Sequence, residues 1–197
     1  MKGLLLKDWY VIRKVYWTYL LIILVFSGVY VWADGRSSMI WYPCFIAQLT
    51  VVSLMSYEEA GKWSQFAGTL PYTRAQIVSE KYILSLLAAA FVLGLIVAAR
   101  GLRMLRGVNV EALQNLLGLL NLNLIYGTVC LPMIFRFGRE KGMLFAGCLA
   151  GVFTGIGGFL LAERQIDLSA AWVTGIAVVL FVLSWLASLR IYQKREL

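Results

Sequence analysis

The polar stretch 57–81, YEEAGKWSQFAGTLPYTRAQIVSEK, separates two long apolar runs, and the rest of the chain is organised around it. It is the longest polar interval in a sequence in which 61% of the residues are hydrophobic. A short amphipathic helix is predicted in the first part of this stretch. It should end before Leu70-Pro71, because proline disfavours helical geometry in the residue that precedes it. Six charged residues make this stretch a candidate docking surface for a soluble partner: Glu58, Glu59, Lys62, Arg74, Glu80 and Lys81.

The composition on both sides of this stretch is that of a membrane protein. Only 14% of the 197 residues are charged, and the mean hydropathy is +0.79. A helix rises about 1.5 Å per residue, so a run of about 20 apolar residues crosses about 30 Å of hydrocarbon. We therefore predict an all-α fold, with residues 1–197 forming one domain of six transmembrane helices, at 15–33, 39–56, 82–99, 112–135, 143–162 and 169–189.

The distribution of basic residues predicts the orientation of these helices. If the N-terminus is cytoplasmic, 13 of the 18 lysines and arginines lie on the inner side. This matches the positive-inside bias and places both termini in the cytoplasm. The net charge of +8 is therefore an orientation signal, and we predict no nucleic-acid partner.

Residues 1–14 precede the first apolar segment and are too charged to cross a membrane. Leu5, Trp9 and Ile12 fall on one helical stripe, which predicts a helix lying in the inner interface. Trp9 and Tyr10 are then expected at the level of the lipid headgroups. The alternative is a plain cytoplasmic extension of the first transmembrane helix.

Three arginines at i, i+3 and i+6, Arg100, Arg103 and Arg106, lie on the outer side in this topology, against the general bias. Two interpretations remain open for them. They either reach the outer headgroups or attract an anionic substrate.

Small and amide residues mark helix contacts in the second half of the chain. Gly147, Gly151 and Gly155 form a doubled small-x-x-x-small stripe that permits close helix approach, within one chain or between two. Three intramembrane amides predict interhelical hydrogen bonds, with pore lining as the alternative: Asn115, Asn121 and Asn123.

Several chemistries are disfavoured by what the sequence lacks. It holds no histidine, no phosphate-binding G-x-x-x-x-G-K-[ST] loop and no Asp, Glu, Lys or Arg inside an apolar segment. Glu58 and Glu59 are adjacent, so they point to different sides of a helix and do not form a catalytic pair. A secondary carrier is thus disfavoured, an enzyme is unsupported, and we expect neither a metal nor a cofactor on this chain.

What remains is a membrane subunit that takes its energy from a partner through a cytoplasmic surface. The stretch 57–81 would present a short helix of mixed charge around an aromatic anchor, Trp63 or Phe66, to a groove on that partner. A merely solvated loop is the alternative.

The order of motifs along the chain resembles that of the small six-helix permeases of type-2 ABC exporters. More narrowly, it is similar to the bacterial subfamily that includes the phenol-soluble-modulin exporter permeases. The segments that carry the resemblance are KGLLLKD at 2–8, YEE at 57–59, KW at 62–63, TLPYTR at 69–74, IVSEKY at 77–82 and LPMIFRFGREK at 131–141.

The resemblance implies a multi-pass protein of the bacterial plasma membrane that pairs with a second permease, identical or homologous, and with two ATP-binding subunits. ATP and Mg would be held by those subunits. It also implies a coupling helix between the second and third transmembrane helices, with contacts from Glu58, Glu59, Lys62, Trp63, Phe66, Leu70, Pro71 and Arg74. A second inner contact is expected at Arg136, Arg139, Glu140 and Lys141.

Substrates of this family include amphipathic peptides, antimicrobial peptides, drugs and lipids, which implies export of a hydrophobic or amphipathic molecule across the membrane. Two alternatives remain. One is a permease-like immunity or sensor subunit that binds a peptide or lipid without moving it, and the other is a small membrane enzyme.

Overall fold

The computed structural model describes residues 2–32, 41–61, 63, 66, 73–105, 114–138, 141, 144, 147, 148 and 170–194. Every regular element in these residues is an α-helix, which confirms the all-α prediction. The helices are α1 (Lys2–Val15), α2 (Trp17–Trp32), α3 (Trp41–Ala60), α5 (Arg74–Leu105), α6 (Gln114–Phe137) and α8 (Ala170–Lys194).

Local sequence signals explain where α5 begins and where α6 ends. Thr73 precedes α5 and forms a capping box with Gln76: each backbone N–H donates to the other residue's side chain, over 3.1 and 3.3 Å. α6 ends at Phe137, and Gly138 follows with a positive φ of 75°. Glycine suits this left-handed position because it has no Cβ.

Three described helices are long and apolar enough to cross a membrane: α5 over its whole length, Leu116–Phe137 of α6 and Trp172–Gln193 of α8. A fourth is obtained if α1 and α2, which meet at a bend of 71°, count as one span. α2, α3, α5, α6 and α8 correspond in sequence to five of the six predicted spans. The remaining one, 143–162, lies almost entirely outside the described residues.

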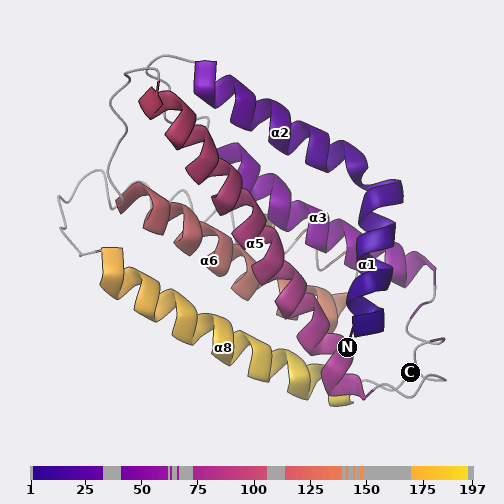
Figure 1. Cartoon of the computed structure of the whole chain (residues 1–197). Coiled ribbons are helices and arrows are strands. Elements are labelled where there is room, and N and C mark those ends of the chain that lie inside the picture. Colours follow the sequence, from indigo (N-terminus) through magenta and orange to yellow (C-terminus); the bar gives the residue numbers. More distant parts are fainter. Residues whose placement is uncertain are drawn as a thin grey trace.

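The helices form one bundle in which α2 and α8 flank α3, α5 and α6, and α1 lies across one end (Figure 1). We call this end basal and the opposite end, where α2 and α5 finish, apical. α6 and α8 run in the same direction: the rings of Phe135 and Tyr192 are 5.6 Å apart, and Thr128 accepts a 2.7 Å hydrogen bond from Ser184. Both helices therefore end at the basal end.

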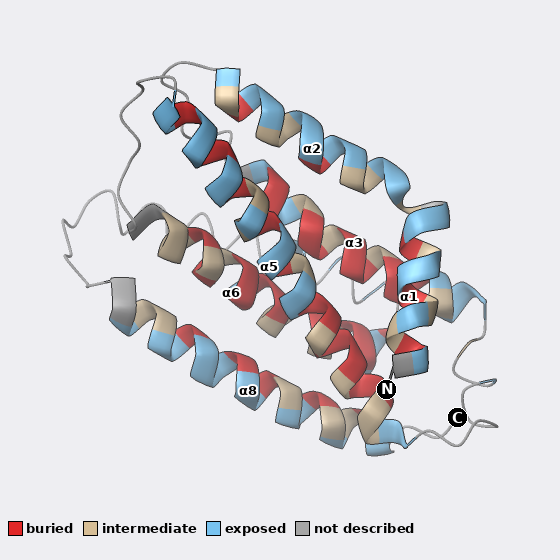
Figure 2. Cartoon of the chain, in the orientation of Figure 1, coloured by how far each residue is buried: buried red, intermediate tan, exposed pale blue. Residues whose placement is uncertain are grey.

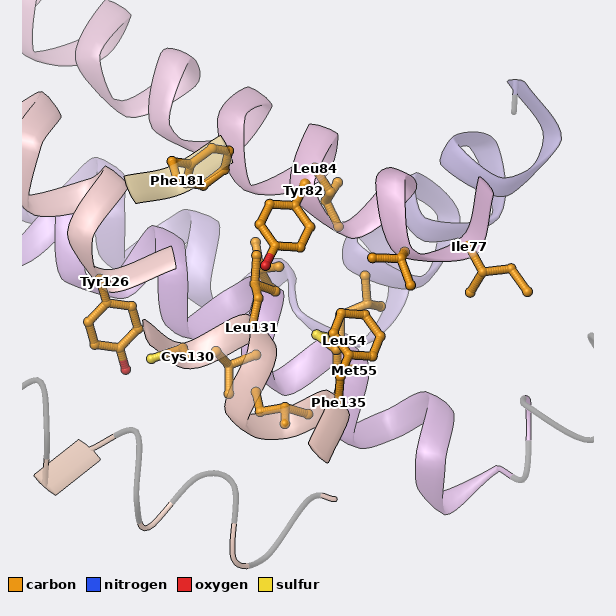
Figure 3. Packing of buried hydrophobic residues seen from close by; sticks show 14 of the residues in the cluster. Leu54, Met55, Ile77, Tyr82, Leu84, Tyr126, Cys130, Leu131, Phe135 and Phe181 are labelled. Atoms are coloured by element: carbon orange, nitrogen blue, oxygen red, sulfur yellow. The ribbon is translucent and has the colours of Figure 1, made fainter. Parts of the chain in front are cut away.

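Buried side chains gather along the middle of the bundle, whereas the outward faces of α2, α5 and α8 are exposed and apolar (Figure 2). The basal core includes Leu54, Tyr82 and Phe181, and Figure 3 shows these rings and aliphatic chains packed between helices. A smaller apical core includes Ile23 and Val92. The exposed apolar faces suit contact with lipid or with another subunit.

One of the amides expected in helix packing does join helices. Gln48 on α3 donates to the Asn123 carbonyl oxygen on α6 at 3.2 Å, and Ser85 on α5 donates to Gln48 at 3.0 Å. Asn121 is buried on the same helix, and the side chain of Asn115 lies outside the described residues. Asn123 therefore serves packing, the first of the two interpretations.

Candidate functional site

Five charged side chains from three helices meet at the basal end of the bundle, and we call them the basal charge cluster. They are Lys7 and Asp8 on α1, Glu58 on α3, and Glu80 and Lys81 on α5. The Lys81 side chain is only 2% exposed, and its ammonium group lies 2.8 Å from an oxygen of Asp8 and 2.8 Å from an oxygen of Glu58. Lys7 also pairs with Glu58, and it lies 3.0 Å from the second Asp8 oxygen. The cluster ties α1 to the ends of both helices that flank the stretch 57–81.

The sequence places Asp8 in this cluster because it shares a helix face with Leu4 and Ile12. All three are buried, and Asp8 is completely covered. Of the stripe predicted to lie in the interface, Ile12 is buried in the bundle, whereas Trp9 is 56% exposed, and its place among the lipid headgroups stays a prediction. The face buried against the bundle is the one that carries Asp8. The physical reason is that a helix face containing Asp8 can be buried when Lys81 and Lys7 compensate its charge.

The environment of Asp8 keeps its carboxyl ionised. Burial by itself would raise the pKa, but the positive charges of Lys81 and Lys7 outweigh it. The pKa of Asp8 is held below its ordinary value as a result. Asp8 is thus available as a fixed negative partner for both lysines.

The residues predicted to contact an ATP-binding subunit fall partly inside and partly outside this cluster. Glu58 is half-buried within it, and the Lys7 ammonium lies 4.1 Å from the centre of the Trp63 ring. The Phe66 ring is exposed and 5.5 Å from that of Trp63. Arg74 is exposed and donates to the Gln193 carbonyl of α8 at 2.9 Å. Of the remaining four predicted contacts, Glu59 lies at the end of α3, and Lys62, Leu70 and Pro71 lie outside the described residues.

The second predicted inner contact lies next to the first. Glu59, at the end of α3, approaches Gly138 at the end of α6, where a Cβ would be 2.9 Å from a carboxylate oxygen. Arg136 and Lys141 are exposed, whereas Arg139 and Glu140 lie outside the described residues. The two surfaces that the sequence suggested separately therefore begin side by side.

Of the three glycines in the predicted stripe, only Gly147 lies in the described part of the chain. Gly147 is exposed, and nothing in the described part of the chain comes within 4 Å of a Cβ built on it. Gly151 and Gly155 lie outside the described residues.

Sequence reasoning missed most of the basal charge cluster. Spacing along one helix relates Glu58 only to its neighbour Glu59, and it gives no partner for Lys7 or Asp8. The structure brings Asp8 and Glu58 to one ammonium group across 50 residues of chain. The available signal was the spacing of Asp8 between Leu4 and Ile12, which puts a charge on an apolar face.

The basal charge cluster joins three helices through ion pairs between lysines and carboxylates. No group of three or more His, Cys, Asp or Glu side chains among the described residues could hold a metal ion. Its ion pairs connect α1, α3 and α5.

The chain matches the family model of the ABC-2 family transporter protein over residues 3–193. It therefore belongs to the ABC-2 transporter family, as the resemblance had predicted. Together with the apolar helices, this makes it the membrane component of an ABC transporter, a class that works with ATP-binding subunits. No curated protein and no solved structure matches the chain.

Proposed function

We propose that this chain is the permease subunit of a bacterial ABC exporter that moves amphipathic or antimicrobial peptides, or other hydrophobic substrates, out of the cell. Two separately encoded ATP-binding subunits would bind ATP and Mg, and a second permease copy or homologue would complete the transport path. The family match supports the permease role, and the similarity to phenol-soluble-modulin exporter permeases suggests the substrate class.

The observation that carries the coupling mechanism is the basal charge cluster. Glu58 and Lys81 stand near the two ends of the stretch 57–81, and their side chains are joined over 2.8 Å. A push on this stretch by an ATP-binding subunit would therefore move α3 and α5 together. Asp8 and Lys7 would pass the same displacement to α1.

The contact surface itself would be made by side chains outside the cluster. We assign it Glu59, Lys62, Trp63, Phe66, Leu70, Pro71 and Arg74, with Glu58 bridging to the cluster. The second contact would come from Arg136, Arg139, Glu140 and Lys141. The approach of Glu59 to Gly138 supports one continuous surface.

A fifth transmembrane helix at 143–162 remains part of the proposal. Gly138 is at the basal end, and α8 begins at Ala170 at the apical end, because α6 and α8 run in the same direction. A helix that returns across the bundle would connect these two points. Gly147, Gly151 and Gly155 would then pack this helix against its neighbours or against the second permease.

Co-purification with the ATP-binding subunit, followed by ATPase assays in lipid with and without amphipathic peptides, tests this function. We expect a stable complex whose hydrolysis is stimulated by peptide. Glu59→Arg and Trp63→Ala should weaken assembly or stimulation, whereas Arg190→Gln, an exposed change on α8, should not.

Two results would count against the proposal. Unchanged assembly and stimulation in both contact variants would remove the coupling role from this surface. A complex that binds peptide but transports none into inverted vesicles would instead favour the immunity or sensor subunit.

A further inference from the structure

Two of the three outer arginines turn inward instead of reaching into solvent. Arg100 and Arg103 lie on the last turns of α5 at the apical end, and each is only 7% exposed. The Arg103 guanidinium lies over the ring of Tyr30 on α2, 4.7 Å from its centre. Freely snorkelling cations would be exposed, so these side chains form part of a built site.

The charge of Arg103 is not balanced by any carboxylate in the described part of the chain. The acidic side chains described there, Asp8, Glu58, Glu59 and Glu80, all belong to the basal end. Glu80 and Arg100 are on one helix, and 20 residues of helix span about 30 Å, well beyond a Debye length of about 8 Å. The buried Arg103 Nε has no hydrogen-bond partner.

A buried cation is costly unless an anion pairs with it, and the cation–π contact with Tyr30 does not neutralise the charge. The guanidinium group presents paired donors that match the oxygens of a phosphate. Arg103, held on the Tyr30 ring, and Arg100, one turn earlier on α5, are therefore suited to one phosphate group.

The surroundings of the arginines indicate where that phosphate comes from. Trp32, at the end of α2, and Leu102 and Leu105, on α5, are exposed apolar side chains at the same end of the bundle. They offer a surface for acyl chains beside the two cations. A ligand with a phosphate head and an apolar tail fits both features, whereas a free anion uses only one.

We propose that Arg100 and Arg103, backed by Tyr30, bind the phosphate of a phospholipid in the leaflet at the apical end. The site goes beyond the proposed export function and does not depend on its substrate. It requires only that the chain is a membrane subunit.

Native mass spectrometry of the full-length chain in detergent, titrated with phosphatidylglycerol, tests the site. We expect Arg103→Gln to lower lipid retention about tenfold, as for the loss of a charge-assisted pair. Arg103→Lys keeps the charge without the planar fork and should lower retention less. Arg190→Gln removes an exposed charge from the basal half of α8 and should leave retention unchanged.

Tyr30→Phe and Tyr30→Leu provide a second, milder comparison. Phenylalanine preserves the ring under Arg103, so retention should stay near that of the natural chain. Leucine removes the ring and should lower retention. Retention that is equal in these two variants would show that the ring does not organise the site, and would overturn that part of the proposal.

Three outcomes would overturn the lipid site as a whole. Retention unaffected by Arg103→Gln in a folded protein would remove the arginines from lipid binding. If Asp34→Asn or Glu111→Gln lowered stability as much as Arg103→Gln does, and added lipid did not change that stability, the arginines would pair with carboxylates of the same chain. Full displacement of phosphatidylglycerol by inorganic phosphate at equal concentration would assign the site to a free anion.

Discussion

Lys81 is the residue on which the basal charge cluster depends. Its ammonium group is buried against the carboxylates of Asp8 and Glu58, and Lys7 supplies the second positive charge that balances the pair. Breaking a buried ion pair leaves a charge without compensation, which costs far more than losing an exposed pair. Removing the charge of Lys81 alone should therefore destabilise the protein more than removing the charges of Lys81 and Asp8 together.

Lys81→Met should lower the free energy of unfolding by about 3–5 kcal/mol, because Asp8 and Glu58 are left with Lys7 alone. Lys81→Met combined with Asp8→Asn should cost less than the sum of the two single changes. Thermal unfolding of the purified variants in one detergent measures both. The control is Lys14→Met, the same change at an exposed position of α1. Strict additivity would show that Asp8 and Lys81 do not interact.

Gly138, which follows α6 with a positive φ, lies close to the Glu59 side chain at the end of α3. Gly138→Ala should destabilise the protein by about 1 kcal/mol or more, because alanine resists a positive φ and its Cβ would crowd Glu59. Gly175→Ala, in an open position on α8, should be neutral or stabilising. Unfolding temperatures compare the two. An equal effect at both glycines would contradict the strained geometry at Gly138.

At the scale of the elements, the bundle is held by short polar contacts as well as by apolar packing. Tyr82 on α5 makes 2.8 Å hydrogen bonds with Ser184 and Ser188 on α8. Gln48 and Asn123 join α3 to α6. Such bonds between helices set their register where an apolar surface alone would permit sliding.

At Gly127, α6 lies close to side chains of both α5 and α8. A Cβ there would be 3.0 Å from the Ser85 hydroxyl and 3.3 Å from the Phe181 ring. Gly127→Leu should therefore cost about 1–3 kcal/mol through overpacking. Gly94→Leu, on an open face of α5, should be nearly neutral. Thermal unfolding distinguishes them, and a stable Gly127→Leu protein would show that the helices can separate without loss.

At the scale of the whole molecule, the parallel course of α6 and α8 makes a prediction about topology. The end of α6 and the start of α8 lie at opposite ends of the bundle. In a membrane these two points should face opposite compartments, with the end of α6 in the cytoplasm in the proposed orientation.

Cysteine labelling of intact cells and inverted vesicles tests this topology in a Cys148→Ser background, which removes the exposed native thiol. A membrane-impermeant reagent should modify Trp172→Cys in intact cells and Lys141→Cys only in inverted vesicles. Both positions are exposed in the structure. Labelling of both from one side would eliminate the fifth transmembrane helix.

The amino-acid sequence by itself determined the membrane class, the helical fold, the family and the approximate positions of α2, α3, α5, α6 and α8. These follow from the length of apolar runs and from local motifs, which act within one element. The tertiary structure alone decided that Asp8 faces inward, that Lys81 joins Asp8 to Glu58, and that Arg103 lies on Tyr30. The reason is that a charge can be buried only where a compensating group from another helix meets it, and sequence spacing does not reveal that meeting.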